Sequence, residues 1–336
     1  MSEHESRQRT DPNRAHEDIE DEWGISDVEY APDVGPLALD TIHEGDCREL
    51  LNRVADESVQ LTVTSPPYNI GKQYGTDDDD RVMDEWRELM REVLEELFRV
   101  TAPDGKVCFN VGFSTPDSDS KGRYYRIPLR SHIVTLAHEA GFDFYDEFVW
   151  LKNTFASHGG GALFGSYPYP SNLMANQQHE YVLVFRKWVS EDYYSEREIP
   201  PEGSPRRERS ELDIDTWREY TSSVWEIAPA SPERLGIDHE AMFPVELPRR
   251  LVRMYSFVGD AVLDPFIGTG TTALAARENH RHYLGFEQQS GYVDIARSRL
   301  DGSLSRTVET RNRANEALNS AAEDGHTQHR LGEYGE

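Results

Sequence analysis

A strand, a glycine-bearing turn, a helix and a second strand follow one another near residue 270, and this succession constrains the fold more than any other stretch. The apolar and helical patterns place these elements, in order, at residues 261–264, 265–270, 271–279 and 283–286. Gly268 and Gly270 allow a tight turn and let the backbone approach a ligand closely. A strand, turn and helix in this order are typical of a site for a nucleotide-like cofactor.

The turn lacks the features of two common nucleotide sites. It has no Gly-Lys-Ser/Thr run, which argues against ATP chemistry, and no third glycine, which makes a dehydrogenase the least favoured class. A one-carbon donor built from adenosine and an amino-acid tail fits better than a pyrophosphate. The second strand ends in Glu287, seventeen residues after Gly270, and an acid at such a position can bind two ribose hydroxyls.

Another predicted strand, about 200 residues before the glycine-bearing turn, also ends in polar and aromatic side chains. Residues 61–64 form a β-branched run that predicts a short strand, and Pro66 and Pro67 end it because neither can donate to a sheet ladder. Ser65 and Tyr68 are thereby presented at the carboxyl end of a strand, where ligands bind in open α/β sheets. Alone, this stretch favours a proline turn with a packed tyrosine. The glycine-bearing turn downstream makes a functional role the better interpretation.

The chain is strongly acidic. Its 336 residues hold 62 Asp and Glu against 35 Lys and Arg, a net charge of −27. An ordinary acidic protein is one interpretation, but adaptation to a salt-rich cytoplasm is favoured, because dense carboxylates retain hydration and salt screens their repulsion. The charge alone argues against a nucleic-acid partner. In high salt that argument weakens, since phosphate contacts lose affinity there, and a DNA enzyme would depend on base stacking and groove contacts.

The remaining composition bounds the compartment. There are two cysteines without metal-ligand spacing, no apolar run of membrane-spanning length and a polar N-terminus. These features predict a cytoplasmic protein without a membrane segment, a disulfide framework or a bound metal. The length suits one large α/β domain or two smaller ones.

Together the two strand ends resemble the amino-methylating DNA methyltransferases, which transfer a methyl group from S-adenosylmethionine to an exocyclic base nitrogen. The resemblance covers roughly residues 39–300 and rests on Thr64-Ser-Pro-Pro-Tyr-Asn69 and Asp264-Pro-Phe-x-Gly-x-Gly-Thr-Thr272. The catalytic motif precedes the cofactor motif, which is the family's permuted β order. The implied fold is a mostly parallel, seven-stranded, Rossmann-like α/β sheet flanked by helices, with an inserted target-recognition region.

The resemblance divides the chain into five regions. These are an acidic tail, a catalytic half containing a long loop at 152–178, an irregular target-recognition region, a cofactor-binding half and a polar tail, at residues 1–37, 38–187, 188–236, 237–302 and 303–336. Recognition of the target sequence is expected in residues 153–178 and 188–236, because loops this long are usually functional or disordered.

The resemblance also implies catalytic roles. Ser65 Oγ and the Pro66 carbonyl accept the two N–H bonds of the target amino group, which aims its lone pair at the methyl. Pro67 stiffens the corner, and Tyr68 stacks on a base flipped out of the duplex. The methyl moves in one in-line step, so positioning supplies most of the catalysis. A C5-cytosine enzyme would need an activated cysteine, and neither cysteine here follows a proline.

The donor and DNA contacts follow by position. The donor site is assigned to Asp264, Phe266, Gly268, Gly270, Glu287, Asp46 near the adenine, and Phe243 with Pro244 near the methionine end. Core packing is an equal interpretation for the two phenylalanines, and a turn or helix cap for Asp46. The DNA contacts are assigned to Asn69, to Lys152 and Asn153 near the target base, and to Arg206, Arg207 and Arg249 because they belong to two basic clusters. The arginine clusters could equally be solvated faces, and Lys152 and Asn153 a strand-end cap.

The resemblance predicts the partners and the target. Double-stranded DNA is the substrate, a cognate restriction endonuclease is a candidate partner, and the protein is a monomer or homodimer. Family members with serine in the place of Ser65 mostly methylate cytosine N4, so N4-cytosine is predicted and N6-adenine is the alternative. An RNA or protein methyltransferase, or a non-catalytic DNA-binding module, are the other classes left open.

Overall fold

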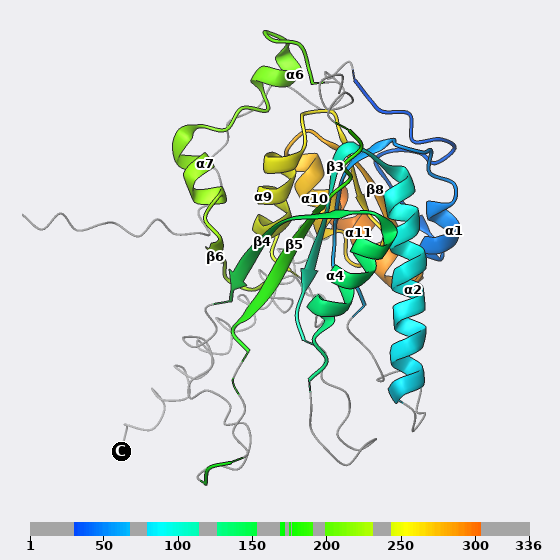
Figure 1. The fold of residues 1–336 in the computed structure, drawn as a ribbon. Coiled ribbons are helices and arrows are strands. Elements are labelled where there is room, and N and C mark those ends of the chain that lie inside the picture. The colour runs from blue at the N-terminus through cyan, green and yellow to red at the C-terminus, as the bar shows by residue number, and fades with distance from the viewer. Residues whose placement is uncertain are drawn as a thin grey trace, which may run out of the picture.

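The computed structural model describes residues 30–67, 79–113, 126–152, 169–171, 175, 177–190, 199–230 and 243–303, with only the backbone of 79–82. A sheet of eight strands in these ranges forms the centre of the molecule (Figure 1). Its strands, in chain order, are β1 (Thr41–Glu44), β2 (Val59–Thr64), β3 (Thr101–Val111), β4 (Asp143–Leu151), β5 (His179–Arg186), β6 (Val224–Glu226), β7 (Ala261–Asp264) and β8 (His282–Glu287).

The sheet is mostly parallel, as predicted. The spatial order is β1-β8-β7-β2-β3-β5-β4-β6, and β5 alone among them runs antiparallel to its neighbours. Sequential β-α-β units therefore build an α/β fold. The sheet exceeds the expected seven strands by the short edge strand β6. That strand and the helices α6 (Pro205–Glu208) and α7 (Ile214–Tyr220) belong to the region predicted to be irregular, so that prediction was wrong.

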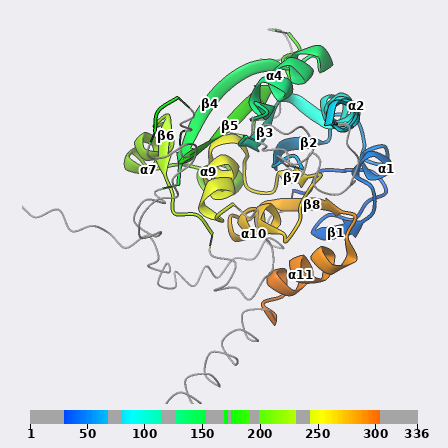
Figure 2. The same ribbon diagram turned by 90° about the horizontal axis from the view of Figure 1, so that it is seen from below.

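Helices cover both faces of the sheet (Figure 2). Along β5, Leu183 and Phe185 pack on one face, whereas Val182 and Val184 pack on the other, because successive side chains of a strand alternate. The first face is covered by α1 (Cys47–Leu51), α2 (Asp79–Val100) and α4 (Leu129–Ala140). The second is covered by α9 (Glu246–Tyr255), α10 (Thr271–Glu278) and α11 (Ser290–Leu300). Burial of both faces explains the apolar runs of central strands, such as residues 182–185 of β5 and 261–263 of β7.

The core extends beyond the predicted boundary at residue 38. Val34 and Leu37 are buried against the face that α1 covers, although both fall in the stretch predicted as a tail. Residues 1–29 and 304–336, the rest of the predicted tails, lie outside the described ranges. No helix within those ranges is long and apolar enough to span a membrane.

The connections that follow the neighbouring strands β7 and β2 lead to opposite sides of the sheet. From β7 it passes through α10 to β8 on one side, and from β2 it passes through α2 to β3 on the other. Strands β7 and β2 are parallel neighbours, with Thr62 opposite Leu263. Such a switch point leaves a crevice outside the carboxyl ends of the two strands, where open α/β sheets bind ligands. Both sequence motifs begin at this edge.

Candidate active site

A buried carboxylate joins the two motifs. Thr64 Oγ1, at the end of β2, donates to Asp264 Oδ1 over 2.6 Å, and Thr272 Oγ1, on α10, donates to Asp264 Oδ2 over 2.7 Å. The Phe266 backbone N–H also donates to Oδ1, over 3.0 Å. Asp264 is fully buried, so these three donors replace the water that its carboxylate loses on folding. The Ser-Pro-Pro corner and the glycine-bearing turn are therefore fixed relative to each other.

Burial raises the pKa of Asp264 to about 6, and the hydrogen bonds from Thr64 and Thr272 only partly oppose this effect. The carboxyl of an unfolded chain has a pKa near 3.8. Because the native state holds this proton more tightly, the group favours folding at low pH, and its contribution declines as the pH rises from about 4 to about 6. Keeping the charge buried at neutral pH costs about 3 kcal/mol.

We expect Asp264→Asn to remove this pH-dependent loss and to leave the protein at least as stable at pH 7. The amide oxygen still accepts from Phe266, and the new NH₂ group donates to Thr272 Oγ1, whose hydrogen can go to the Val63 carbonyl 3.2 Å away. The difference in free energy of unfolding between variant and wild type should change by about 2 kcal/mol between pH 4 and pH 7. Urea unfolding across that range measures it, and a constant difference would contradict the assignment.

The glycine-bearing turn has the backbone geometry that its sequence predicts. Gly268 and Gly270 have φ of 52° and 84°, in the left-handed region that favours glycine. A Cβ on Gly270 would lie 3.0 Å from the Ala296 Cβ, so α11 packs directly on the turn. The turn thus leads into the first residue of α10, and its Phe266 and Gly268 N–H groups lie beside the ends of β7 and β8.

Glu287 lies beside this turn at the end of β8. Its Oε2 accepts from the Gly268 N–H over 3.2 Å, and its Oε1 accepts from the Gln289 N–H over 2.8 Å. Each oxygen of a carboxylate has two lone pairs, so one on each remains for a diol. The Gly45 N–H donates to the Glu287 carbonyl over 2.9 Å, which brings Asp46 to the same edge.

Asp46 and Phe243 also have the structural roles that the sequence left open. Asp46 caps α1 by accepting from the Arg48 N–H over 2.9 Å, and its ion pair with the Arg48 guanidinium lowers its pKa. Phe243 is partly buried against the core on the α9 side. Phe266 packs in the same way against the opposite core. Their contacts to a donor remain predictions.

The Ser-Pro-Pro corner is braced from α2. Trp86 Nε1 donates to the Pro67 carbonyl over 3.0 Å, and Pro66 is buried. Ser65 is partly exposed at the crevice. Tyr68 and Asn69 lie outside the described residues, as does Asn153.

Sequence reasoning missed a polar chain behind Ser65. Lys152 forms an ion pair with Glu180, Glu180 accepts from Asn110 Nδ2 over 2.6 Å, and Asn110 Nδ2 lies 3.4 Å from Ser65 Oγ. Lys152 thus lies near the catalytic corner, and its contact with the target base or with DNA stays a prediction. The available signal for Asn110 was a polar residue near the carboxyl end of an otherwise apolar strand.

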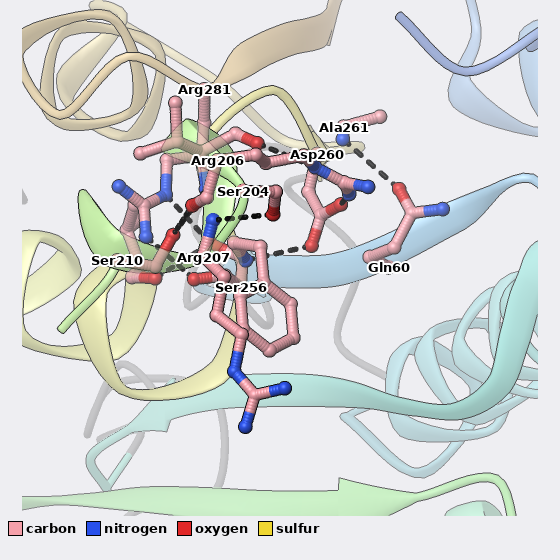
Figure 3. Close-up of polar contacts among 12 residues, drawn as sticks. Gln60, Ser204, Arg206, Arg207, Ser210, Ser256, Asp260, Ala261 and Arg281 are labelled. Atoms are coloured by element: carbon pink, nitrogen blue, oxygen red, sulfur yellow. Dashed lines mark hydrogen bonds and ion pairs between the residues drawn. The ribbon is translucent and has the colours of Figure 1, made fainter. Parts of the chain in front are cut away.

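The predicted arginine contacts lie elsewhere. Arg206 forms an ion pair with the buried Asp260 and donates to the Val258 carbonyl over 2.8 Å, at the amino-terminal end of β7 (Figure 3). This edge is opposite Ser65, and α6 lies there in Figure 1. Arg249 pairs with Glu246 and Glu278, and Arg207 is an exposed residue of α6. A cavity of about 1340 Å³ opens at this opposite edge and is therefore separate from the switch point.

We expect Arg206→Ala to destabilise the protein by about 3 kcal/mol, because it removes the ion-pair partner of the buried Asp260. The salt dependence of DNA binding should not change, since the side chain neutralises Asp260 and not a phosphate. Urea unfolding and binding titrations at several salt concentrations measure both. Arg207→Ala, which removes an exposed arginine of the same short helix, is the matched control for the stability measurement. A weaker dependence of DNA affinity on salt concentration in Arg206→Ala would instead support the predicted contact between Arg206 and a phosphate.

The glycine-bearing turn and Glu287 lie at the ends of β7 and β8, and the Ser65 hydroxyl and the Pro66 carbonyl lie at the end of the neighbouring strand β2. This arrangement fits a bound cofactor beside its substrate. The family model described as DNA methylase, which unites N6- and N4-methyltransferases, matches residues 59–298. The chain therefore belongs to the DNA methylase family and is a DNA amino-methyltransferase of the N4/N6 type.

Archaeal and bacterial relatives agree with this assignment. The type II methyltransferase M.MjaI of Methanocaldococcus jannaschii is 32% identical over 283 residues, which cover 76% of this chain and 89% of the relative. M.MthZI of Methanothermobacter thermautotrophicus is 30% identical over 274 residues, covering 76% and 74%. A putative DNA modification methylase of Thermus thermophilus, solved in complex with S-adenosyl-L-methionine, superposes with a TM-score of 0.62 at 32% identity, covering 80% of this chain and 94% of that one.

Proposed function

We propose that this protein transfers a methyl group from S-adenosylmethionine to the exocyclic N4 of a flipped cytosine in a short duplex site. The observation that carries the proposal is the Thr64–Asp264 hydrogen bond of 2.6 Å, because it sets the Ser65 corner beside the donor turn. A methyl acceptor and a methyl donor would therefore meet across the switch point between β2 and β7.

The residues of the donor motif fit S-adenosylmethionine. Glu287 keeps one free lone pair on each oxygen for the two ribose hydroxyls, and the Gly268–Gly270 turn allows close backbone approach. When bound, the donor supplies an electrophilic methyl on a sulfonium. The complex of the Thermus relative with this molecule supports the same donor here.

Ser65 and Pro66 would act by orientation. The Ser65 Oγ and the Pro66 carbonyl accept the two amino hydrogens, so the nitrogen lone pair, otherwise delocalised into the ring, is turned toward the donor. Trp86 holds the corner by its hydrogen bond to the Pro67 carbonyl, which limits movement of these acceptors. Tyr68 is proposed to stack on the base, and the base has to leave the duplex to reach this corner.

Serine at position 65 supports cytosine over adenine as the target, and N6-adenine is the alternative. Labelled methyl transfer to duplex DNA, followed by digestion to nucleosides, tests the proposal, with Ser65→Ala as the control of strongly reduced activity. N4-methylcytosine is the expected product. If N6-methyladenine were the only product, the target base would be adenine and not cytosine. Transfer to RNA or protein and not to DNA would overturn the assignment of DNA as the substrate.

The relatives' names support a modification role. Both archaeal relatives are called type II methyltransferases, so we propose that this enzyme protects or marks a short recognition sequence in the cytoplasm, with a cognate restriction endonuclease as candidate partner. The net charge of −27 supports adaptation of the protein to a salt-rich cytoplasm. Higher activity and stability in dilute buffer than in molar salt would contradict that adaptation.

A further inference from the structure

The polar chain behind Ser65 lies on three strand ends that meet at the catalytic edge. Asn110 is on β3, Glu180 on β5 and Lys152 directly after β4, whose pairing with β5 continues through a 2.8 Å hydrogen bond from the Lys152 N–H to the Gln178 carbonyl. Gly112 leaves room for Glu180, since a Cβ there would lie 3.2 Å from the Glu180 Cγ. The chain is thus built into the sheet rather than placed on a loop.

The direction of the hydrogen bonds in this chain is fixed by chemistry. The Lys152 ammonium can only donate, and the Glu180 carboxylate that it contacts can only accept. Asn110 must therefore turn its NH₂ group toward Glu180, and its Nδ2–Glu180 Oε2 distance is 2.6 Å. The same Nδ2 also donates to Ser65 Oγ over 3.4 Å.

This direction decides what Ser65 offers to a substrate. A serine hydroxyl has one hydrogen and two lone pairs, and Asn110 occupies one lone pair. One lone pair and the hydroxyl hydrogen then remain for the base. Cytosine and adenine both present an amino hydrogen beside an unprotonated ring nitrogen, which is a donor next to an acceptor. The free groups of Ser65 match that pair.

We propose that Glu180 and Asn110 are positioning residues that hold the Ser65 hydroxyl in this orientation, with Lys152 fixing Glu180. The inference rests on the proposed function, since it concerns how the target base is received. Glu180 acts only through Asn110, because an amide does not pass a proton to a carboxylate. The chain therefore orients Ser65 and does not serve as a general base.

Glu180→Gln should reverse the chain. The oxygen of the new amide stays on Lys152, so its NH₂ group faces Asn110, which turns its own oxygen toward that NH₂ group and Ser65. Ser65 then donates its hydrogen to Asn110 and presents only lone pairs to the base. We expect the single-turnover rate of methyl transfer to fall about ten- to a hundredfold, with the Kd for S-adenosylmethionine unchanged. Asn110→Asp, which cannot donate, should cause a similar loss.

Two comparisons separate positioning from a general structural effect. In an Asn110→Ala background Glu180→Gln should cause no further loss, because the link to Ser65 is already broken. Glu147→Gln is the matched control, a half-buried acid of neighbouring β4 paired with Arg130, and it should keep the wild-type rate. Additive losses in the double variant, or wild-type rates in both Glu180→Gln and Asn110→Asp, would overturn the inference.

The orientation of the Asn110 amide can be read without any substrate. The Asn110 side-chain NH₂ resonances of ¹⁵N-labelled protein, assigned by their loss in Asn110→Ala, should shift in Glu180→Gln and stay in place in Glu147→Gln. Unshifted resonances in Glu180→Gln would overturn the inference. If the resonances shift as expected but the wild-type protein methylates no DNA, the proposed function alone is contradicted.

Discussion

Ser65→Ala is expected to lower the single-turnover rate of methyl transfer by about 10²- to 10³-fold, which is the usual effect of removing one preorganised polar group from a reacting centre. Ser65 lies on the short segment between the end of β2 and the buried Pro66, so loss of its Oγ removes an acceptor without moving the backbone. The affinities for S-adenosylmethionine and for duplex DNA should stay within a few-fold of wild type, since the amino group needs orientation mainly in the transition state.

Rapid-quench transfer of labelled methyl measures the rate, and separate titrations measure the two affinities. Ser58→Ala is the matched control: Ser58 is a buried serine just before the other end of β2, and its Oγ donates to the Ala55 carbonyl over 2.7 Å. That variant should lose some stability and keep its rate. A Ser65→Ala enzyme with a wild-type rate would show that the corner does not orient the amino group.

The donor half of the site could be predicted because its pattern is local. Strand, turn, helix and strand succeed one another within 27 residues, from Ala261 to Glu287, and the left-handed glycines lie where the sequence places them. Gly141, which ends α4 with φ of 107°, is a further case in which a local residue preference sets the end of an element. Local backbone preferences and apolar periodicity decide such elements, so no knowledge of distant contacts is needed.

The acceptor half depends on contacts between distant segments, and these were only partly predictable. Asn110 and Glu180 meet because β3 pairs antiparallel with β5, a register that no local pattern records. Arg206 was assigned to DNA from its charge, but its partner Asp260 is 54 residues away. Strand β6 was missed because three residues carry too little periodicity for a strand to be recognised.

Glu287→Ala is expected to raise the Kd for S-adenosylmethionine by about a hundredfold or more, because two charge-assisted hydrogen bonds to ribose hydroxyls are each worth about 1.5–3 kcal/mol. The variant also leaves the Gly268 N–H without its acceptor, so the turn that opens α10 loses a brace. Glu287→Gln should weaken binding nearly as much, since its NH₂ group would face either the Gly268 or the Gln289 N–H.

Isothermal titration calorimetry with S-adenosylmethionine measures the effect, and the rate at saturating donor separates binding from chemistry. That rate should recover toward wild type, because Glu287 contacts the part of the donor that does not react. Glu278→Ala is the matched control: Glu278 ends the same helix α10, its partner is Arg249, and it is remote from the turn. If Glu287→Ala bound the donor as tightly as wild type, the Glu287 carboxylate would not contact the ribose. Its role would then be structural, as the acceptor of the Gly268 and Gln289 N–H groups.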